Sequence, residues 1–184
     1  TNMKIKIGKK LITSKSKSFI VAEMSGNHGG SLSEALNIIK AAKKAGVDAI
    51  KLQTYTADTI TLKSKKKDFL ISRNSPWKKK KYLWNLFNYA HTPWAWHKKL
   101  FNLARKLNLE IFSSPFDESA VDFLEKLNCS AYKIASSEIN HIPLIRKVAK
   151  TKKPIILSTG LSTYKDLDLA IKNIRSLNSN KIII

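Results

Sequence analysis

The chain has 184 residues, 43% of them hydrophobic, which is enough to bury one sizeable core and excludes an intrinsically disordered protein. Its single cysteine, Cys129, excludes an intrachain disulfide framework, and no apolar run reaches the roughly 18 residues that a membrane span needs. The net charge of +21 would ordinarily indicate a nucleic-acid or membrane partner, but the lysines are spread over predicted helix surfaces apart from runs at 65–67 and 78–81. We therefore expect a cytoplasmic protein with neither partner, and an anionic small substrate fits the charge equally well.

Residues 1–18 are expected to form a β-hairpin that covers the N-terminal end of the fold. Residues 19–24 predict a buried strand, and Ser31 predicts the start of a helix that Gly46 ends. Residues 49–55 predict the second strand. Apolar strands that alternate with amphipathic helices indicate a parallel sheet.

Residues 57–91 interrupt this alternation with a segment that is far longer than a usual strand-to-helix loop. The segment combines the two lysine runs with several aromatic side chains, namely Trp77, Tyr82, Trp84, Phe87 and Tyr89. Long loops in compact domains are usually functional, which favours a role at the site. A lid that packs its own aromatic residues is an equally good alternative.

Thr92 and Pro93 predict the N-cap and the first residue of a helix, after which strands and helices alternate again. Asp117 can cap a further helix, and Pro143 can begin another. The remaining strands are expected at 110–116, 131–136, 154–159 and 181–184. The predicted fold class is α/β, a (β/α)8 barrel of which residues 19–184 contain about five βα units and the start of strand six. Because the chain ends inside a strand, we expect a longer protein.

Polar residues recur toward the C-terminal halves of five successive predicted strands, where barrel enzymes build their active sites. They are Glu23, then Lys51 and Gln53, then Ser113 and Ser114, then Lys133, Ser136 and Glu138, and finally Ser158 and Thr159. A charged side chain in a covered parallel strand is costly unless it is paired or used. For one pair, such as Glu23 with Lys51, an internal salt bridge is the simpler explanation. The repetition favours a site, and two lysines with several hydroxyls suggest a ligand that carries phosphate and carboxylate groups.

Five segments resemble, in order, the motifs of sialic-acid synthases. They are residues 22–28 (AEMSGNH), 50–54 (IKLQT), 112–117 (FSSPFD), 132–138 (YKIASSE) and 157–160 (LSTG). Residues 89–97 (YAHTPWAWH) and 120–125 (AVDFLE) are similar to the pseudaminic acid synthase branch of that family. Ala95 departs from the glutamate usual in that branch, which puts any role of that carboxylate in doubt here.

The resemblance implies a dimeric enzyme that condenses phosphoenolpyruvate with an N-acetylated amino sugar to a nonulosonic acid and releases phosphate. It implies that phosphoenolpyruvate is bound by Lys51, Ser114, Lys133, Ser136 and Ser158, and the sugar by Gln53, Phe116 and Glu138. Glu23 would be the catalytic acid/base group, whereas His28 could be catalytic or structural.

The resemblance also implies a divalent metal, Mn²⁺ or Mg²⁺, whose ligands we expect beyond Ile184. We expect the antifreeze-like C-terminal domain of the family to be absent from these residues too, so that the fragment alone would be inactive. Three alternatives stay open, and they are an N-acetylneuraminate synthase, a Schiff-base aldolase that uses Lys133, and an inactive barrel fragment.

Overall fold

The computed structural model describes residues 4–177 and 181–184, and its strands form two sheets. β1 (Lys4–Ile7) and β2 (Lys10–Thr13) form an antiparallel hairpin. The second sheet has six parallel strands in chain order, namely β3 (Val21–Glu23), β4 (Ala49–Thr54), β5 (Glu110–Pro115), β6 (Tyr132–Ile134), β7 (Ile155–Leu157) and β8 (Ile182–Ile183).

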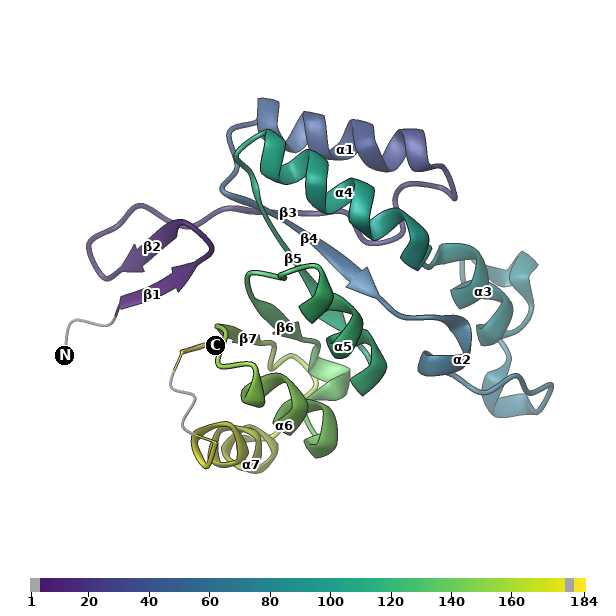
Figure 1. Ribbon diagram of the computed structural model, residues 1–184. Coiled ribbons are helices and arrows are strands. Elements are labelled where there is room, and N and C mark those ends of the chain that lie inside the picture. The colour runs from purple at the N-terminus through teal and green to yellow at the C-terminus, as the bar shows by residue number, and fades with distance from the viewer. Residues whose placement is uncertain (1–3, 178–180) are drawn as a thin grey trace.

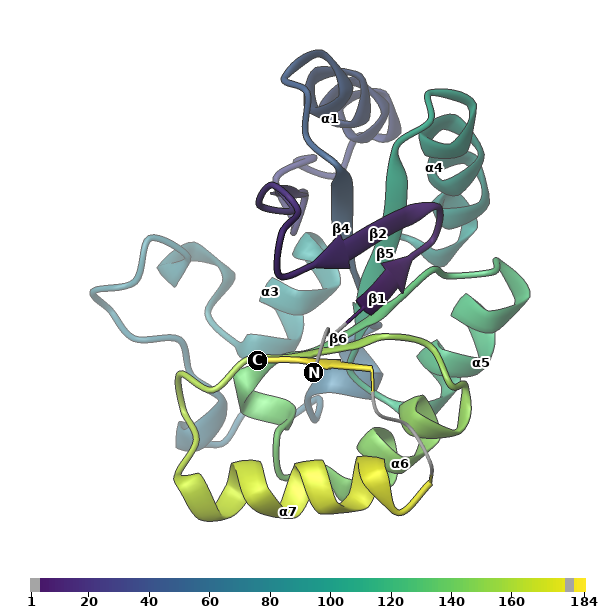
Figure 2. The same cartoon turned by 90° about the vertical axis from the view of Figure 1, so that its left-hand side faces the viewer.

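Helices lie along one face of this sheet and return the chain from the end of one strand to the start of the next (Figure 1). These helices are α1 (Leu32–Lys44), α4 (Trp94–Lys106), α5 (Glu118–Lys126), α6 (Ile142–Lys150) and α7 (Tyr164–Arg175). In Figure 2 they form an arc around the strands. The predicted fold class, an incomplete α/β barrel, is confirmed. None of the helices among the described residues is both long and apolar enough to cross a bilayer.

Local sequence explains where several helices begin. The Ser31 hydroxyl accepts a hydrogen bond from the Glu34 amide, and the Asp117 carboxylate accepts from the amides of Ser119 and Ala120. Such side chains satisfy backbone N–H groups that have no partner within the first turn. The apolar faces of these helices then pack on the strands in one continuous core.

The predicted N-cap at Thr92 is wrong, because the helix α4 takes Pro93 as its N-cap, without a side-chain hydrogen bond. The hydroxyl of Thr92 instead pairs with His28 Nε2 at 3.0 Å. The strand expected at 131–136 is also shorter than predicted. It ends at Ile134, and a 3-10 turn, η3 (Ser136–Glu138), follows.

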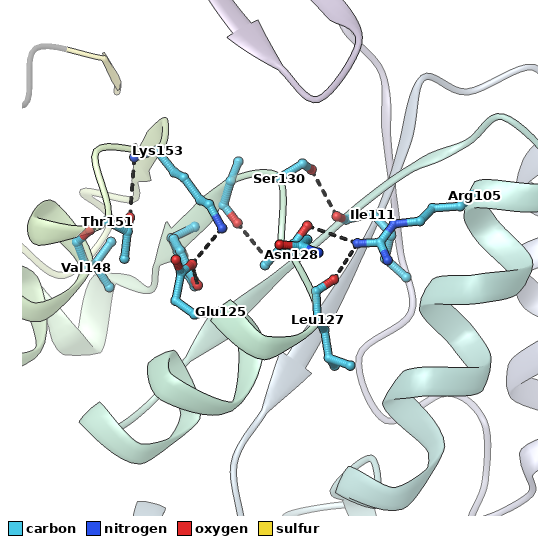
Figure 3. A network of polar contacts seen from close by, with 12 residues as sticks. Arg105, Ile111, Glu125, Leu127, Asn128, Ser130, Val148, Thr151 and Lys153 are labelled. Carbon is cyan, nitrogen blue, oxygen red and sulfur yellow. Dashed lines mark hydrogen bonds and ion pairs between the residues drawn. The ribbon is translucent and has the colours of Figure 1, made fainter.

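The N-terminal ends of the strands are closed by the hairpin and by polar contacts between loops. The Lys9 amide donates to Glu110 Oε1 at 2.8 Å, at the first residue of β5. On the same side of the sheet, the Arg105 guanidinium donates to the carbonyl of Asn128 at 2.9 Å, and the Ser130 hydroxyl donates to the Ile111 carbonyl at 2.9 Å (Figure 3). Stabilising contacts at this end leave the C-terminal ends of the strands for a site.

The long segment between β4 and α4 contains α2 (Ala57–Ile60), two 3-10 turns, η1 (Lys67–Phe69) and η2 (Lys78–Lys80), and α3 (Leu83–Ala90). Trp84 packs within this segment: its Nε1 donates to Asp58 at 2.8 Å, and Lys63 Nζ lies 4.3 Å from the centroid of its ring. Trp77 and Tyr89, in contrast, are 53% and 48% exposed, and both the functional loop and the lid that packs its own aromatic residues stay predictions.

Candidate functional site

The strand register places five of the predicted site residues on one face of the sheet. Glu23 pairs with Lys51 across β3 and β4, and Gln53 pairs with Ser114 across β4 and β5. Since side chains alternate along a strand, these four residues share a face. Lys133 lies on the same face, because its neighbour Tyr132 pairs with Ser113, the neighbour of Ser114.

The opposite face is the one that the helices cover. There Thr54 Oγ1 pairs with His97 Nε2 of α4 at 2.9 Å, and the Tyr132 hydroxyl donates to Glu125 of α5. The face with Glu23, Lys51 and Lys133 is therefore the inner face of the curved sheet. We refer to these three residues as the charged triplet.

The charged triplet is electrostatically coupled. Lys51 Nζ forms an ion pair with Glu23 Oε2, and the Lys51 side chain is only 14% exposed. Burial lowers the pKa of Lys133, and repulsion from Lys51 lowers it further, whereas Glu23 raises it. Within residues 4–177 and 181–184, no carboxylate lies within ion-pair distance of Lys133. Two ammonium groups near a single carboxylate leave a positive charge that a bound anion would neutralise.

The expected burial of Glu23 is wrong, because its side chain is 42% exposed. β3 is an edge strand of the described sheet and has a neighbour on one side only, so solvent reaches its C-terminal end. The carboxylate is nevertheless held, since Glu23 Oε1 accepts a hydrogen bond from the Ser25 amide at 3.1 Å and Oε2 pairs with Lys51. Its orientation is fixed without burial.

The serines that are predicted to bind phosphoenolpyruvate lie at or near the C-terminal ends of their strands. Ser114 is buried within β5, whereas Ser136 and Ser158 are half-buried and follow β6 and β7. The Ser158 amide donates to the Ile134 carbonyl at 3.1 Å, which extends the pairing of β6 with β7 by one bond. Glu138, also half-buried, lies in the η3 turn and accepts a hydrogen bond from Ser137.

An aromatic cluster stands at the C-terminal ends of β4 and β5. Tyr55 is buried, and its ring meets Phe116 edge-on at 5.4 Å and Phe87 of α3 at 5.8 Å between centroids. Burial raises the pKa of the Tyr55 phenol to about 12, so it stays protonated. The cluster joins the long segment to Phe116, one of the three residues assigned to the sugar. Sequence reasoning missed Tyr55, whose only signal was its place at the end of a strand.

A second group of polar residues lies between the strands and the helices, on the outer face of the sheet. The sequence motifs of the strands do not separate these residues from those of the site. Thr54 Oγ1 pairs with both His97 Nε2 and Ser113 Oγ, the latter at 2.6 Å, and all three residues are buried. Burial lowers the pKa of His97 to about 4, which keeps the imidazole neutral. Ser113 thus belongs to the helix-facing layer, whereas its neighbour Ser114 faces inward. Alternation along β5 predicts that the two serines face opposite ways, and the register with Gln53 shows that Ser114 is the one that faces inward.

A metal site was expected outside these residues. Among residues 4–177 and 181–184, no three His, Cys, Asp or Glu side chains gather in a way that could hold a metal ion. The described residues therefore do not fit the divalent metal that the resemblance implies.

Comparisons with known proteins agree with the geometry. A model of the NeuB family matches residues 38–184. Pseudaminic acid synthase of Campylobacter jejuni serotype O:2 is 51% identical over 151 residues, which cover 82% of this chain and 43% of the relative. The N,N'-diacetyllegionaminic acid synthase of Legionella pneumophila is 34% identical over 164 residues, which cover 89% of this chain and 46% of the relative. The chain thus spans less than half the length of these curated relatives.

The fold has a close counterpart among solved structures. The N-acetylneuraminic acid synthetase of Leptospira borgpetersenii is 27% identical and superposes with a TM-score of 0.82, over 98% of this chain and 57% of that one. The chain therefore belongs to the NeuB family, and its relatives are synthases of sialic-type sugar acids.

Proposed function

We propose that the full-length protein condenses phosphoenolpyruvate with an N-acetylated amino sugar, forms a nonulosonic acid of the pseudaminic type and releases phosphate. The observation that carries this proposal is the charged triplet on the inner face of the sheet, in a chain similar to pseudaminic acid synthases. Phosphoenolpyruvate carries a phosphate and a carboxylate, which two ammonium groups can hold together.

In this proposal the ammonium groups of Lys51 and Lys133 bind the two anionic groups of phosphoenolpyruvate. Lys51 can do so while paired with Glu23, because an ammonium group has three N–H donors. The hydroxyls of Ser114, Ser136 and Ser158 supply neutral hydrogen-bond donors toward the C-terminal ends of the neighbouring strands. Gln53, Phe116 and Glu138 contact the amino sugar.

The reaction then proceeds in two bond-forming steps. The methylene carbon of phosphoenolpyruvate attacks the aldehyde carbon of the open-chain sugar, and the aldehyde oxygen takes up a proton from solvent to become a hydroxyl. The adjacent carbon, which bears the phosphate, becomes an oxocarbenium ion. Water adds to that carbon, Glu23 takes a proton from the water, and the C–O bond to phosphate then breaks. Glu23 suits this role because its carboxylate stabilises the cation and its orientation is fixed by Ser25 and Lys51.

No step of the proposed reaction is assigned to the divalent metal that the resemblance implies, because the described residues offer no set of ligands for it. We propose that residues outside the described ones supply its ligands. Homodimer formation stays a prediction that rests on the resemblance, and a cytoplasmic location stays one that rests on the single cysteine, Cys129.

The sugar we propose is the deoxy, doubly N-acetylated altrose precursor of pseudaminic acid. The similarity to a pseudaminic acid synthase, at 51%, exceeds the 34% to a legionaminic acid synthase. The apolar cluster of Tyr55, Phe87 and Phe116 also suits a sugar that lacks one hydroxyl, because burying an unmatched hydroxyl costs roughly 1 to 3 kcal/mol. The exposed Trp77 and the Asp58-bound Trp84, which the sequence also assigned to an apolar lid, are less suited to that role.

The test is a competition assay on the full-length protein with limiting phosphoenolpyruvate, a divalent metal and both sugars, the altrose derivative and N-acetylmannosamine. Mass spectrometry of the products and release of phosphate are measured together. Consumption of the altrose derivative first supports the proposal. Preference for N-acetylmannosamine would indicate an N-acetylneuraminate synthase instead.

The alternative function, a Schiff-base aldolase, is tested in a separate experiment. Borohydride would trap an imine between pyruvate and Lys133 and so label that lysine covalently. The synthase proposal predicts no label, with Lys133→Met as the control for background modification.

A further inference from the structure

His28 is a buried polar residue, 1% exposed, to which the proposed reaction assigns no role. It lies in the segment that joins β3 to α1, five residues after Glu23. Its Nε2 pairs with Thr92 Oγ1 at 3.0 Å, and its Nδ1 accepts a hydrogen bond from the Gly30 amide at 3.1 Å. The ring of Trp96 on α4 meets the imidazole edge-on at 5.4 Å between centroids.

These contacts determine the protonation of the ring. The backbone N–H of Gly30 can only donate, so Nδ1 must carry a lone pair and no proton. A neutral imidazole then has its proton on Nε2 and donates it to the Thr92 hydroxyl. Burial lowers the pKa of His28, and the nearby His91 lowers it further, which agrees with a neutral ring.

The same contacts connect two parts of the chain, namely the segment after Glu23 and the start of α4. Thr92 lies between α3 and α4, at the end of the long segment, and is itself buried. A second close approach lies beside it: a Cβ added to Gly26 would lie 2.9 Å from the Ala90 carbonyl oxygen. The chain between Glu23 and α1 is thus held against the junction of α3 and α4 at two points.

This segment also holds the Glu23 carboxylate. The Ser25 amide donates to Glu23 Oε1, and Ser25 adopts a left-handed backbone conformation with φ of 47°. For a residue other than glycine such a conformation persists only where the surroundings enforce it. A turn hydrogen bond from the Asn27 amide to the Met24 carbonyl at 3.0 Å encloses Ser25, and the bonds of His28 and the contact at Gly26 hold this turn against its surroundings.

We propose that His28 is a positioning residue, whose neutral, Nε2-protonated ring joins Thr92 to the segment after Glu23 and so keeps the Ser25 amide on the Glu23 carboxylate. The consequence for turnover rests on the proposed function, whereas the tautomer and the position of Ser25 do not. A merely structural histidine would contribute to stability without changing either the Ser25 contact or turnover at saturating substrate.

The first arm of the test is ¹⁵N NMR of the full-length protein labelled in its histidines, at neutral pH. We expect His28 as the neutral tautomer with the proton on Nε2. A proton on Nδ1, or a charged ring, overturns the proposal. The signal is assigned by its loss in His28→Asn, with His141→Gln as the control at a histidine next to α6.

The second arm uses Thr92→Val, which keeps the shape of Thr92 and removes the acceptor, and Thr92→Ser, which restores it. We expect the Ser25 amide signal to shift in the valine variant and to return in the serine variant. This readout needs no catalysis, so it tests the positioning claim even if the proposed reaction is wrong. An unshifted Ser25 signal overturns the claim.

The third readout is kinetic. A misplaced catalytic group costs up to roughly a hundredfold in rate, so Thr92→Val should lower kcat by roughly 10- to 100-fold. The KM for phosphoenolpyruvate should stay within about twofold, because that ligand is assigned to other strands. Thr92→Ser should recover most of kcat. Equal kcat in all three proteins, or a loss confined to KM, contradicts the positioning role.

Discussion

Acidification is expected to destabilise this protein through His97, the buried histidine between β4 and α4. The pKa of His97 falls from 6.5 in the unfolded chain to about 4 in the folded protein, mainly because burial disfavours the charged ring. The unfolded chain therefore binds more protons than the native protein between these two pH values. The free energy of unfolding that the neutral ring contributes is therefore complete above pH 6.5, and it is lost as the pH falls toward about 4.

The magnitude follows from the same two pKa values. Since one pKa unit corresponds to about 1.4 kcal/mol, the loss is about 3 kcal/mol over the whole interval. The free energy of unfolding of a typical domain is about 5–15 kcal/mol, so the effect of one histidine should be measurable. His97 Nδ1 donates to the Pro93 carbonyl, so Nε2 of the neutral ring accepts a hydrogen bond from Thr54 Oγ1, and protonation of Nε2 would also break that bond.

The assay is urea unfolding at a series of pH values for the wild-type protein and for His97→Gln. The glutamine amide can still bond to Thr54 but does not titrate in this range, so the difference between the two pH profiles isolates His97. His28, whose pKa is lowered too, is present in both proteins and cancels. Parallel loss of stability in wild type and variant would refute the reasoning.

Four further substitutions, one of them with a matched control, test the site and the fold. Glu23→Gln should lower kcat at least tenfold while phosphoenolpyruvate affinity changes little, because the carboxylate acts on the cation and the attacking water; unchanged turnover would remove Glu23 from the mechanism. Lys51→Ala and Lys133→Ala should each weaken phosphoenolpyruvate binding roughly tenfold or more, measured by calorimetry, and unchanged affinity in both would refute their assignment. Glu125→Gln should lower the free energy of unfolding by about 1–3 kcal/mol in urea titrations, because it weakens the bonds from Tyr132 and Lys153; Asp122→Asn, at a more exposed ion pair, is the matched control and should cost less than about 1 kcal/mol.

The order and type of the elements could be predicted from the sequence because hydrophobic periodicity and capping residues act locally. Ser31 and Asp117 cap their helices as expected, and the six parallel strands follow in chain order. Thr92 shows the limit of local reasoning. A threonine before a proline is a good N-cap signal, but here a histidine 64 residues earlier in the chain takes its hydroxyl. Tertiary contacts of this kind leave no local pattern.

The candidate site shows the same division. Lys51 and Lys133 could be predicted as site residues because they are charged residues within buried strands. The register places both on the inner face with Glu23. The exposure of Glu23 follows from β3 lying at an edge of the described sheet, as the first strand of an incomplete barrel must, but no local pattern around Glu23 indicates it. The contact between Tyr55 and Phe87 could not be predicted, because it joins a strand end to a helix of the long segment whose path has no repeating pattern.

The most direct test of the proposed reaction follows the oxygen atom that bridges carbon and phosphorus in phosphoenolpyruvate. The full-length protein is incubated with phosphoenolpyruvate labelled with ¹⁸O at that bridge, a divalent metal and the altrose-derived sugar, and both products are analysed by mass spectrometry. Attack of water on the oxocarbenium carbon followed by C–O cleavage predicts that the label leaves in the phosphate and that the nonulosonic acid is unlabelled. A label retained in the sugar acid would mean that the P–O bond breaks instead, and this result would contradict the role given to Glu23 and the water that it activates.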